Sequence, residues 1–277
     1  MQEIKNPVAI ITGAASGIAN NLATKLIEMG WSLVLADINI EALRENFKDT
    51  ASNKIITAEL DVTEPENWKR VIATALENFT GIDYLFNIAG VTFPKNIIDS
   101  EPDLIDRHMD INAKGSMYGT MLVAKEMAKQ QSGHIINLAS LAGLAPVAGL
   151  SFYTASKFAI RGFSLAAAAE LKEKGIAVSV IYPDLVKTPM YDYQLGLPPE
   201  TTAMVFSGSK KVLTPEDVTK AILKVVKTKA LELAIPKSRG ILSKAGGTFP
   251  GILMFLSKSL SAKGKKNISK LRSKETS

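Results

Sequence analysis

Short apolar runs alternate with helical segments along most of the chain, and this alternation limits the fold more than any other feature. Seven runs have the length and composition of buried strands: Val8–Thr12, Ser32–Ala36, Lys54–Leu60, Asp83–Ile88, His134–Leu138, Ala177–Tyr182 and Leu231–Ile235. Helical patterns separate them, at Gly17–Met29, at Glu66–Phe79, at about 103–129, at about 153–174 and from Thr214 onward. Strands joined through helices build a parallel sheet whose faces are covered by those helices. Such crossovers are right-handed, which leads to a doubly wound sheet. The pattern predicts an α/β fold, a doubly wound parallel sheet in one domain of residues 1–257.

Composition removes several classes of function. The 277 residues contain no cysteine, which excludes disulfide scaffolds, thiolate catalysis and cysteine-ligated metals. Neither His108 nor His134 stands in a metal-binding pattern such as H-E-x-x-H, so we expect both to be structural and expect no metal site. The apolar run at 8–11 is too short for the core of a signal peptide, and we expect a cytoplasmic protein.

A glycine-containing turn joins the first predicted strand to the first helix. Residues 12–19 read T-G-A-A-S-G-I-A, and glycine at 13 and 17 lets the backbone turn tightly and approach a pyrophosphate. The free N–H groups of the helix that follows attract the phosphates. A plain tight turn explains glycines alone, but the strand–turn–helix context favours a dinucleotide site that includes Gly13, Ser16, Gly17 and Ile18.

Asp37 stands at the end of the second predicted strand, 24 residues after Gly13. A carboxylate there accepts both ribose hydroxyls of an adenosine and repels a 2′-phosphate. Ser16 and Ile38, which would be placed to hold that phosphate, are not basic. We therefore expect NAD as the cofactor, with NADP less favoured. Asp37 could instead cap a helix at Glu41–Phe47.

Tyr153 and Lys157 are one helical turn apart and so lie on one face of a helix. A free tyrosine has a pKa of about 10 and is a poor acid or base at neutral pH. An ammonium group nearby stabilises tyrosinate and lowers that pKa. The spacing alone is common by chance, but Ser140 follows the fifth predicted strand, at the edge of the sheet where ligands bind in such folds.

Taken together, these motifs resemble the short-chain dehydrogenase/reductase family. The matching elements, in order from about Pro7 to Thr188, are T-G-x-x-x-G-I at 12–18, Asp37, Asp61-Val62, N-x-A-G at 87–90, Asn112, Ser140, Y-x-x-x-K at 153–157 and Pro183 with Thr188. The resemblance implies a Rossmann-fold, NAD(P)-dependent oxidoreductase that interconverts an alcohol and a carbonyl. It also implies a homodimer or homotetramer assembled through the two long helices.

The resemblance also implies a role for each matching residue. Tyr153 would transfer the proton, and Lys157 would lower its pKa and bind the nicotinamide ribose. Ser140 would orient the substrate oxygen, and Asn112 would hold a water in a proton relay. The remaining cofactor contacts would come from Asp61, Val62, Asn87, Ala89, Gly90, Pro183, Val186 and Thr188.

Two positions depart from the family pattern. Ala19 replaces the third glycine of the phosphate loop, a change that helix–strand packing absorbs. Asp184 replaces the glycine that usually follows Pro183, which puts a charged side chain beside the nicotinamide pocket. We expect Asp184 either to point to solvent or to favour the positively charged oxidised ring.

The segment 185–213 is expected to be the substrate lid. Its large apolar side chains are Met190, Tyr191, Tyr193, Leu195, Leu197, Met204, Val205 and Phe206, and the opposite wall would consist of Leu141, Leu144 and Val147. Such a pocket suits a hydrophobic small-molecule alcohol or ketone. Packing of the lid on the core explains the same residues equally well.

The net charge of +6 comes entirely from the C-terminus. Residues 1–257 hold 26 basic and 26 acidic residues, whereas 258–277 hold seven basic residues and one acid. We expect 258–277 to be a solvated, partly disordered tail rather than a segment that binds nucleic acid. The apolar run at 249–256 is too short to span a bilayer. We favour its packing on the lid or on a second subunit over an interfacial helix with peripheral membrane contact.

Two further alternatives use the same fold. A protein that senses dinucleotides without catalysis needs the glycine loop but not Tyr153, and the complete set of motif residues argues against it. A peripheral membrane protein would carry its main role in the tail. Deleting residues 258–277 would separate that role from catalysis.

Overall fold

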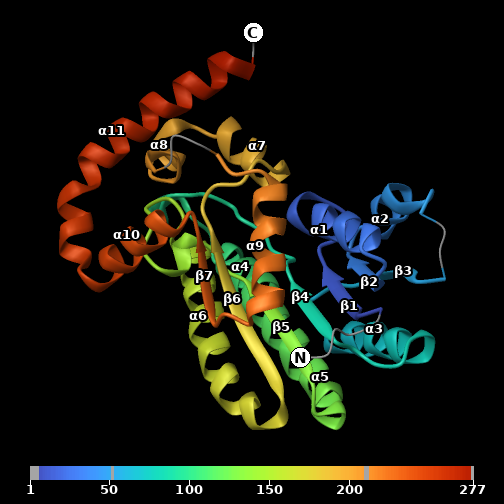
Figure 1. The fold of residues 1–277 in the computed structure, drawn as a ribbon. Coiled ribbons are helices and arrows are strands. Elements are labelled where there is room, and N and C mark those ends of the chain that lie inside the picture. The colour runs from blue at the N-terminus through green and yellow to red at the C-terminus, as the bar shows by residue number, and fades with distance from the viewer. Residues whose placement is uncertain (1–5, 51–52, 209–211, 276–277) are drawn as a thin grey trace.

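The computed structural model describes residues 6–50, 53–208 and 212–275, and its centre is one parallel sheet of seven strands (Figure 1). The strand order is β3-β2-β1-β4-β5-β6-β7. The strands are β1 (Val8–Thr12), β2 (Ser32–Asp37), β3 (Ile55–Glu59), β4 (Tyr84–Asn87), β5 (Gly133–Leu138), β6 (Ile176–Pro183) and β7 (Glu232–Ile235). All seven expected strands are therefore present, and the doubly wound sheet is confirmed.

Helices connect the strands and cover both faces of the sheet. The α-helices are α1 (Gly17–Glu28), α2 (Ile40–Phe47), α3 (Pro65–Asn78), α4 (Asp103–His108), α5 (Gly115–Gln130), α6 (Ser151–Leu171), α7 (Pro189–Gly196), α8 (Pro199–Thr202), α9 (Pro215–Thr228), α10 (Lys237–Thr248) and α11 (Pro250–Glu275). Short 3-10 turns are η1 (Ile97–Asp99), η3 (Leu141–Gly143), η4 (Lys172–Lys174) and η5 (Val205–Ser207), and η2 (Met109–Lys114) is a π-helix.

Two apolar layers hold the helices on the sheet. On β1, Ala9 and Ile11 face the layer that contains α1 and α9, whereas Ile10 faces the layer that contains α3 and α5. This alternation follows from the pleat of a strand, because successive side chains point to opposite faces. Trp68 of α3 is fully buried in the second layer. Burial on both faces explains why these strands are continuously apolar.

The chain reverses its direction of winding between β1 and β4, which are neighbours in the sheet although β2 and β3 lie between them in sequence. In open parallel sheets, ligands bind outside the carboxyl ends of the strands at such a point. The glycine loop after β1 and the segment after β4 meet there, since the Thr12 hydroxyl accepts the N–H groups of Ile88 (3.0 Å) and Ala89 (3.1 Å).

The helix expected at about 103–129 is not continuous. It divides into α4, the π-helix η2 and α5, and Asn112 lies within η2. At the end of η2, the carbonyl of Asn112 accepts the hydroxyl of Ser116 at 2.8 Å. Hydrophobic periodicity does not distinguish a π-turn from an α-turn over six residues, and π-turns frequently mark functional sites.

The C-terminal region differs from the expected solvated tail. Helix α11 begins at Pro250 and continues to Glu275, across position 258, and it runs along one side of the molecule beside α8 (Figure 1). Ile268 is buried against Tyr191, Leu195 and Phe206 of the lid. The Arg272 guanidinium donates to the carbonyls of Leu195 and Leu197, the former at 2.6 and 3.0 Å and the latter at 2.6 Å. These tertiary contacts order a segment whose charge alone suggested disorder.

Residues 209–211 of the expected lid, residues 1–5 and residues 276–277 lie outside the described part of the chain. Within that part, no helix combines the length and apolar character needed to cross a bilayer.

Candidate active site

One cavity of about 1030 Å³ extends from the glycine loop to helix α11. Its cofactor half is lined by most of the residues expected there: Gly13, Ser16, Gly17, Ile18, Asp37, Asp61, Val62, Ala89, Gly90, Pro183, Val186 and Thr188. Ser140, Tyr153 and Lys157 line it further in. The topology therefore brings side chains from most of the length of the sequence to one edge of the sheet.

The glycine loop has the backbone that its sequence suggested. Gly13 and Gly17 adopt φ angles of +75° and +58°, which L side chains rarely adopt. A Cβ at Gly13 would lie 2.9 Å from the Cα of Ala89, and one at Gly17 would lie 3.2 Å from Thr188. Ser16 caps α1 without a side-chain hydrogen bond to the helix. The N–H groups at this helix end are thus free to bind phosphate.

Asp37 is held by the backbone around it. Its carboxylate accepts the N–H of Ala15 at 2.9 Å and the N–H of Asn39 at 2.9 Å. It does not cap helix α2, because Asn39 fills that role by accepting the N–H of Ala42. Each carboxylate oxygen keeps a further lone pair. Asp37 therefore presents acceptors in a fixed position at the end of the cleft.

Two expected site residues stand behind the cavity wall instead of lining it. The Asn87 amide donates to Ser116, Thr120 and Asn137, so it ties β4 to β5 and α5. Asn112 is fully buried, accepts the N–H of Val91 at 2.8 Å and donates to Ser156 at 3.0 Å. A Cβ on Gly90 would lie 3.0 Å from the Asn112 side-chain oxygen and 3.6 Å from Lys157 Nζ, so this glycine separates the amide from the cavity.

Ser140, Tyr153 and Lys157 converge where the cofactor half meets the apolar half. The Lys157 ammonium is 5.5 Å from the centre of the Tyr153 ring and donates to the carbonyl of Leu138 at 3.0 Å. The Ser140 hydroxyl accepts the N–H of Ala142 at 3.2 Å, which leaves its hydrogen free to donate to Tyr153. Helix α6 carries Tyr153 and Lys157, and β5 ends just before Ser140.

Burial shifts both titrating groups of this site. It raises the pKa of Tyr153 to about 12, although the hydrogen bond from Ser140 acts in the opposite direction. Burial lowers the pKa of Lys157 to about 8, because the charged ammonium is taken out of water. At neutral pH, Tyr153 therefore keeps its proton and Lys157 is mostly charged. The lowered tyrosine pKa expected from Lys157 is not found, because burial of the hydroxyl dominates and only the Ser140 hydrogen bond opposes it.

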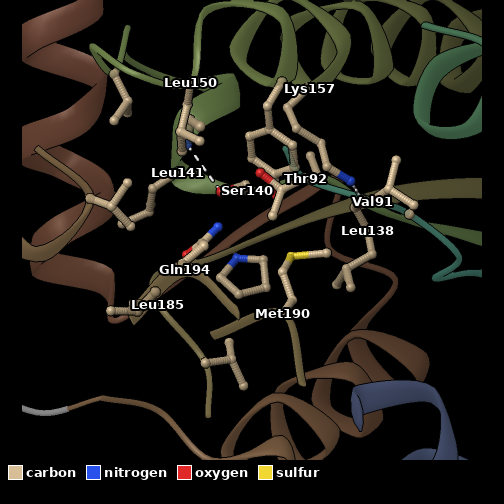
Figure 2. A pocket seen from close by; sticks show the side chains of 18 of the residues that line it. Val91, Thr92, Leu138, Ser140, Leu141, Leu150, Lys157, Leu185, Met190 and Gln194 are labelled. Atoms are coloured by element: carbon tan, nitrogen blue, oxygen red, sulfur yellow. Dashed lines mark hydrogen bonds between the residues drawn. The ribbon is translucent and has the colours of Figure 1, made fainter. Parts of the chain in front are cut away.

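The inner half of the cavity is apolar (Figure 2). Five expected lid residues line it, namely Met190, Tyr191, Tyr193, Met204 and Val205, and so do Leu141 and Val147 of the opposite wall. Leu144, expected in that wall, is buried in a separate apolar cluster with Tyr182. Leu195 and Phe206 pack on α11. The described part of the segment 185–213 thus both lines the pocket and packs on the rest of the protein.

The sequence analysis missed two polar residues of the pocket. Gln194 on α7 is 5% exposed, and Figure 2 shows its amide directed into the cavity. Thr92 is 4% exposed, and its hydroxyl has no hydrogen-bond partner within the described residues. Buried polar groups normally find a partner. A glutamine within a short helix carries no local signal of this kind, because only the tertiary structure places it at the pocket.

Asp184 does not point to solvent, and its effect on the oxidised ring stays a prediction. Its carboxylate pairs with the Arg239 guanidinium at 2.9 Å, and its side chain is only 9% exposed. Arg239 belongs to α10, 55 residues away in sequence, and also lies directly over Gly208. The negative charge expected beside the nicotinamide pocket is therefore matched by a cation from another element.

The two histidines have structural environments. His108 accepts the N–H of Phe93 through Nε2 at 3.1 Å, and its Nδ1 lies 2.6 Å from the carbonyl of Leu104. His134 is hydrogen-bonded to Ser179 at 2.8 Å, and burial lowers its pKa to about 4. Among the described residues, no cluster of three or more His, Asp or Glu side chains is arranged to hold a metal ion.

Comparison with known proteins decides the family. The family model for short chain dehydrogenases matches residues 7–195. The chain belongs to the short-chain dehydrogenase family. Among its relatives, an uncharacterized oxidoreductase of Staphylococcus aureus strain MW2 is 31% identical over 80% of this chain and 92% of its own. A counterpart in Staphylococcus saprophyticus is also 31% identical, with the same coverage.

Solved structures agree with this placement. A short-chain dehydrogenase/reductase from Burkholderia phymatum, crystallised in complex with NAD, superposes with a TM-score of 0.78 at 26% identity and covers 88% of this chain and 94% of its own. Levodione reductase has the same fold, with a TM-score of 0.78 at 23% identity, 86% of this chain and 99% of its own. This short-chain dehydrogenase is an oxidoreductase.

Proposed function

We propose that this short-chain dehydrogenase uses NAD to interconvert a secondary alcohol and a ketone on a hydrophobic substrate. The observation that carries the proposal is the position of Tyr153, Ser140 and Lys157 where the dinucleotide cleft opens into the apolar pocket. A carbonyl in that pocket reaches the proton donor and the cofactor side of the cavity together.

The cleft fits a dinucleotide. Gly13 and Gly17 let the loop lie close to Ala89 and Thr188, where a Cβ would be crowded, and the N-terminus of α1 would supply N–H groups for the pyrophosphate. Asp37 would accept the ribose hydroxyls of the adenosine, and its charge disfavours a 2′-phosphate. The related NAD complex supports the same choice of cofactor. When bound, the nicotinamide supplies or accepts the hydride.

Tyr153 and Ser140 handle the proton and the oxygen. Because the raised pKa of about 12 keeps Tyr153 protonated, its hydroxyl donates the proton to the substrate oxygen during reduction. The Ser140 hydroxyl donates a hydrogen bond to the same oxygen as negative charge develops there. Oxidation needs the tyrosinate: Tyr153 first releases its own proton to solvent, and its oxygen then accepts the proton of the alcohol hydroxyl. The Lys157 ammonium, 5.5 Å from the ring centre, would stabilise this anion. Asn112, behind Gly90, would position Lys157 and the adjoining backbone.

The apolar pocket defines the substrate class. Leu141, Met190 and Val205 would bury a hydrophobic body, and Gln194 offers both a donor and an acceptor in that apolar setting. A substrate with a second oxygen would satisfy Gln194. A purely hydrocarbon body would leave its amide buried and unpaired.

Fluorescence titration with NADH and NADPH, followed by turnover of hydrophobic alcohols and ketones, tests the proposal. We expect NADH to bind more tightly, and Tyr153→Phe to lower kcat by roughly 100-fold or more with little change in NADH affinity. Tyr118→Phe is the matched control and should retain turnover, because this partly buried tyrosine of α5 does not line the cavity. If neither cofactor binds, the proposed function is wrong.

We also propose that copies of the chain associate through α5 and α6. Both helices cover the same face of the sheet, and Met121 on α5 and Phe158 on α6 are exposed. Sedimentation of the wild type and of Phe158→Asp tests this proposal, which a monomeric wild type would refute.

A further inference from the structure

The junction of α10 and α11 concentrates exposed apolar side chains. In the described part of the chain, 17 large hydrophobic side chains are exposed, and seven of these fall within residues 241–256. They are Ile241, Leu242, Phe249, Ile252, Met254, Phe255 and Leu256, and Phe255 is 86% exposed. We call them the apolar patch. Single exposed apolar residues are ordinary on a protein surface, whereas a contiguous group marks an interaction site.

The apolar patch continues into the substrate pocket. Leu242, Phe249, Ile252 and Leu256 are exposed and also line the large cavity. Met254 and Phe255 point the other way, since they are exposed by 74% and 86% and do not line it. The first turns of α11 are therefore apolar on both sides, one toward the pocket and one toward solvent. A helix with apolar residues all round is normally covered on every side.

Basic residues surround the patch. From Lys237 to Lys274 the sequence contains ten lysines and arginines and no acidic residue. Arg239, Lys244 and Lys265 are paired with Asp184, Glu232 and Glu200, respectively. Along α11, Lys258, Lys266 and Lys270 are exposed and lie within about 60° of Phe255 around the helix axis. The inward side of the same helix carries the buried Ile268. The outward face is thus apolar at its beginning and basic beyond.

We propose that this face docks on an anionic lipid bilayer, with the apolar patch inserted at the interface and the lysines against lipid phosphates. A helix at a membrane interface binds in this way: its apolar face is buried in the bilayer, and its basic residues are attracted to anionic lipids. Because the patch is continuous with the pocket mouth, an apolar substrate would pass from the bilayer to Tyr153 without crossing water. This last step rests on the proposed function; the docking itself does not.

A second copy of the chain is a poorer occupant for this face. A symmetric dimer places the same patch of one subunit against that of its partner. Here such contact would bring the basic residues of one α11 close to those of the other, with no acid between Lys237 and Lys274 to compensate. An anionic bilayer complements that charge instead.

Flotation of the full chain with phosphatidylcholine–phosphatidylglycerol vesicles tests the proposal. We expect the protein to bind these vesicles at low salt and to bind them more weakly when NaCl is added. Binding to vesicles of phosphatidylcholine alone should also be weaker. Met254→Ser/Phe255→Ser should lower the partition coefficient by roughly tenfold or more, since it removes the two most exposed side chains of the patch. Met29→Ser/Leu231→Ser is the matched control, because these exposed residues follow α1 and precede β7, away from the pocket. It should bind as the wild type does.

Three results would overturn the docking proposal: no flotation of the wild type at low salt, equal flotation of both double variants, or sedimentation showing a dimer that the patch variant alone disrupts. NADH titration of the same variants is the independent control. Unchanged NADH affinity together with lost flotation supports docking. Lost cofactor binding in the wild type would refute the proposed function but leave the vesicle result standing.

Discussion

The pairing of Asp184 with Arg239 leads to an asymmetric prediction about stability. We expect Arg239→Leu to destabilise the protein more than Asp184→Ala does. The Asp184 side chain is 9% exposed and that of Arg239 is 30% exposed. Removing the arginine therefore leaves a nearly buried carboxylate without its cation, whereas removing the aspartate leaves a guanidinium that still reaches water.

The magnitude follows from burial. Breaking a fully buried ion pair by removing one partner costs about 3–5 kcal/mol, and an exposed pair contributes about 0–1 kcal/mol. Since this pair is intermediate, we expect Arg239→Leu to lower the free energy of unfolding by about 2–3 kcal/mol and Asp184→Ala by about 1 kcal/mol. The double variant should lose less than Arg239→Leu alone, because the buried charge is gone.

Urea unfolding of the wild type, both single variants and the double variant measures the free energies of unfolding and closes the cycle. The ratio of the NAD+ and NADH dissociation constants is a second, independent measure of the effect of the Asp184 charge. Once Arg239 no longer compensates it, Asp184 should favour NAD+ by roughly several-fold. The same cycle with Lys48 and Glu45, an exposed pair on α2 and the residue after it, is the control and should show almost no coupling.

Additive losses in the Asp184–Arg239 cycle would refute this reasoning. So would a larger loss for Asp184→Ala than for Arg239→Leu. Either result would mean that Arg239 acts through its packing against Gly208 and not through the carboxylate.

The other predictions concern the cofactor, the substrate and pH. Asp37→Ser should weaken NADH binding by roughly tenfold and narrow the preference over NADPH; an unchanged ratio in fluorescence titration would contradict the role of Asp37. Gln194→Met should reduce kcat/KM for a hydroxyketone by roughly tenfold relative to the parent ketone, with Met190→Leu as a control that keeps the ratio. His134 has a folded pKa of about 4, below the ordinary value of 6.5, so its contribution to stability is complete above pH 6.5 and is lost as the pH falls toward 4. The loss approaches about 3 kcal/mol, and urea unfolding of His134→Leu across this range should show a correspondingly smaller slope than the wild type.

Much of the fold can be predicted from the sequence because the interactions that determine it are local. A strand buried on both faces must be apolar along its centre, as residues 8–11 of β1 and 33–36 of β2 are. The glycines at 13 and 17 stand where the backbone takes positive φ angles. Tyr153 and Lys157 share a helix face because helical periodicity places residues four apart together. These features depend on neighbours in the chain, and pattern analysis detects them.

Other features depend on which segments meet in space. The sequence suggested disorder after Lys258, but α11 is ordered by contacts of Ile268 and Arg272 with the lid. The π-turn around Asn112 also differs from the continuous helix that the sequence predicted. The cap of α2 is different in kind, because Asn39 accepts the N–H of Ala42 in a local contact that the sequence analysis overlooked.

The sequence by itself therefore determined the parallel sheet, the positive-φ glycine turn after β1 and the placement of Tyr153 and Lys157 on one helix face, since short-range periodicity and backbone conformation carry that information. Only the tertiary structure decided that Arg239 neutralises Asp184, that Gln194 faces the pocket and that α10 and α11 form its outer wall. The pairing of Asp184 with Arg239 crosses 55 residues of chain. No local pattern predicts this pairing, because the two residues come into contact only once the sheet has brought both segments to the same edge.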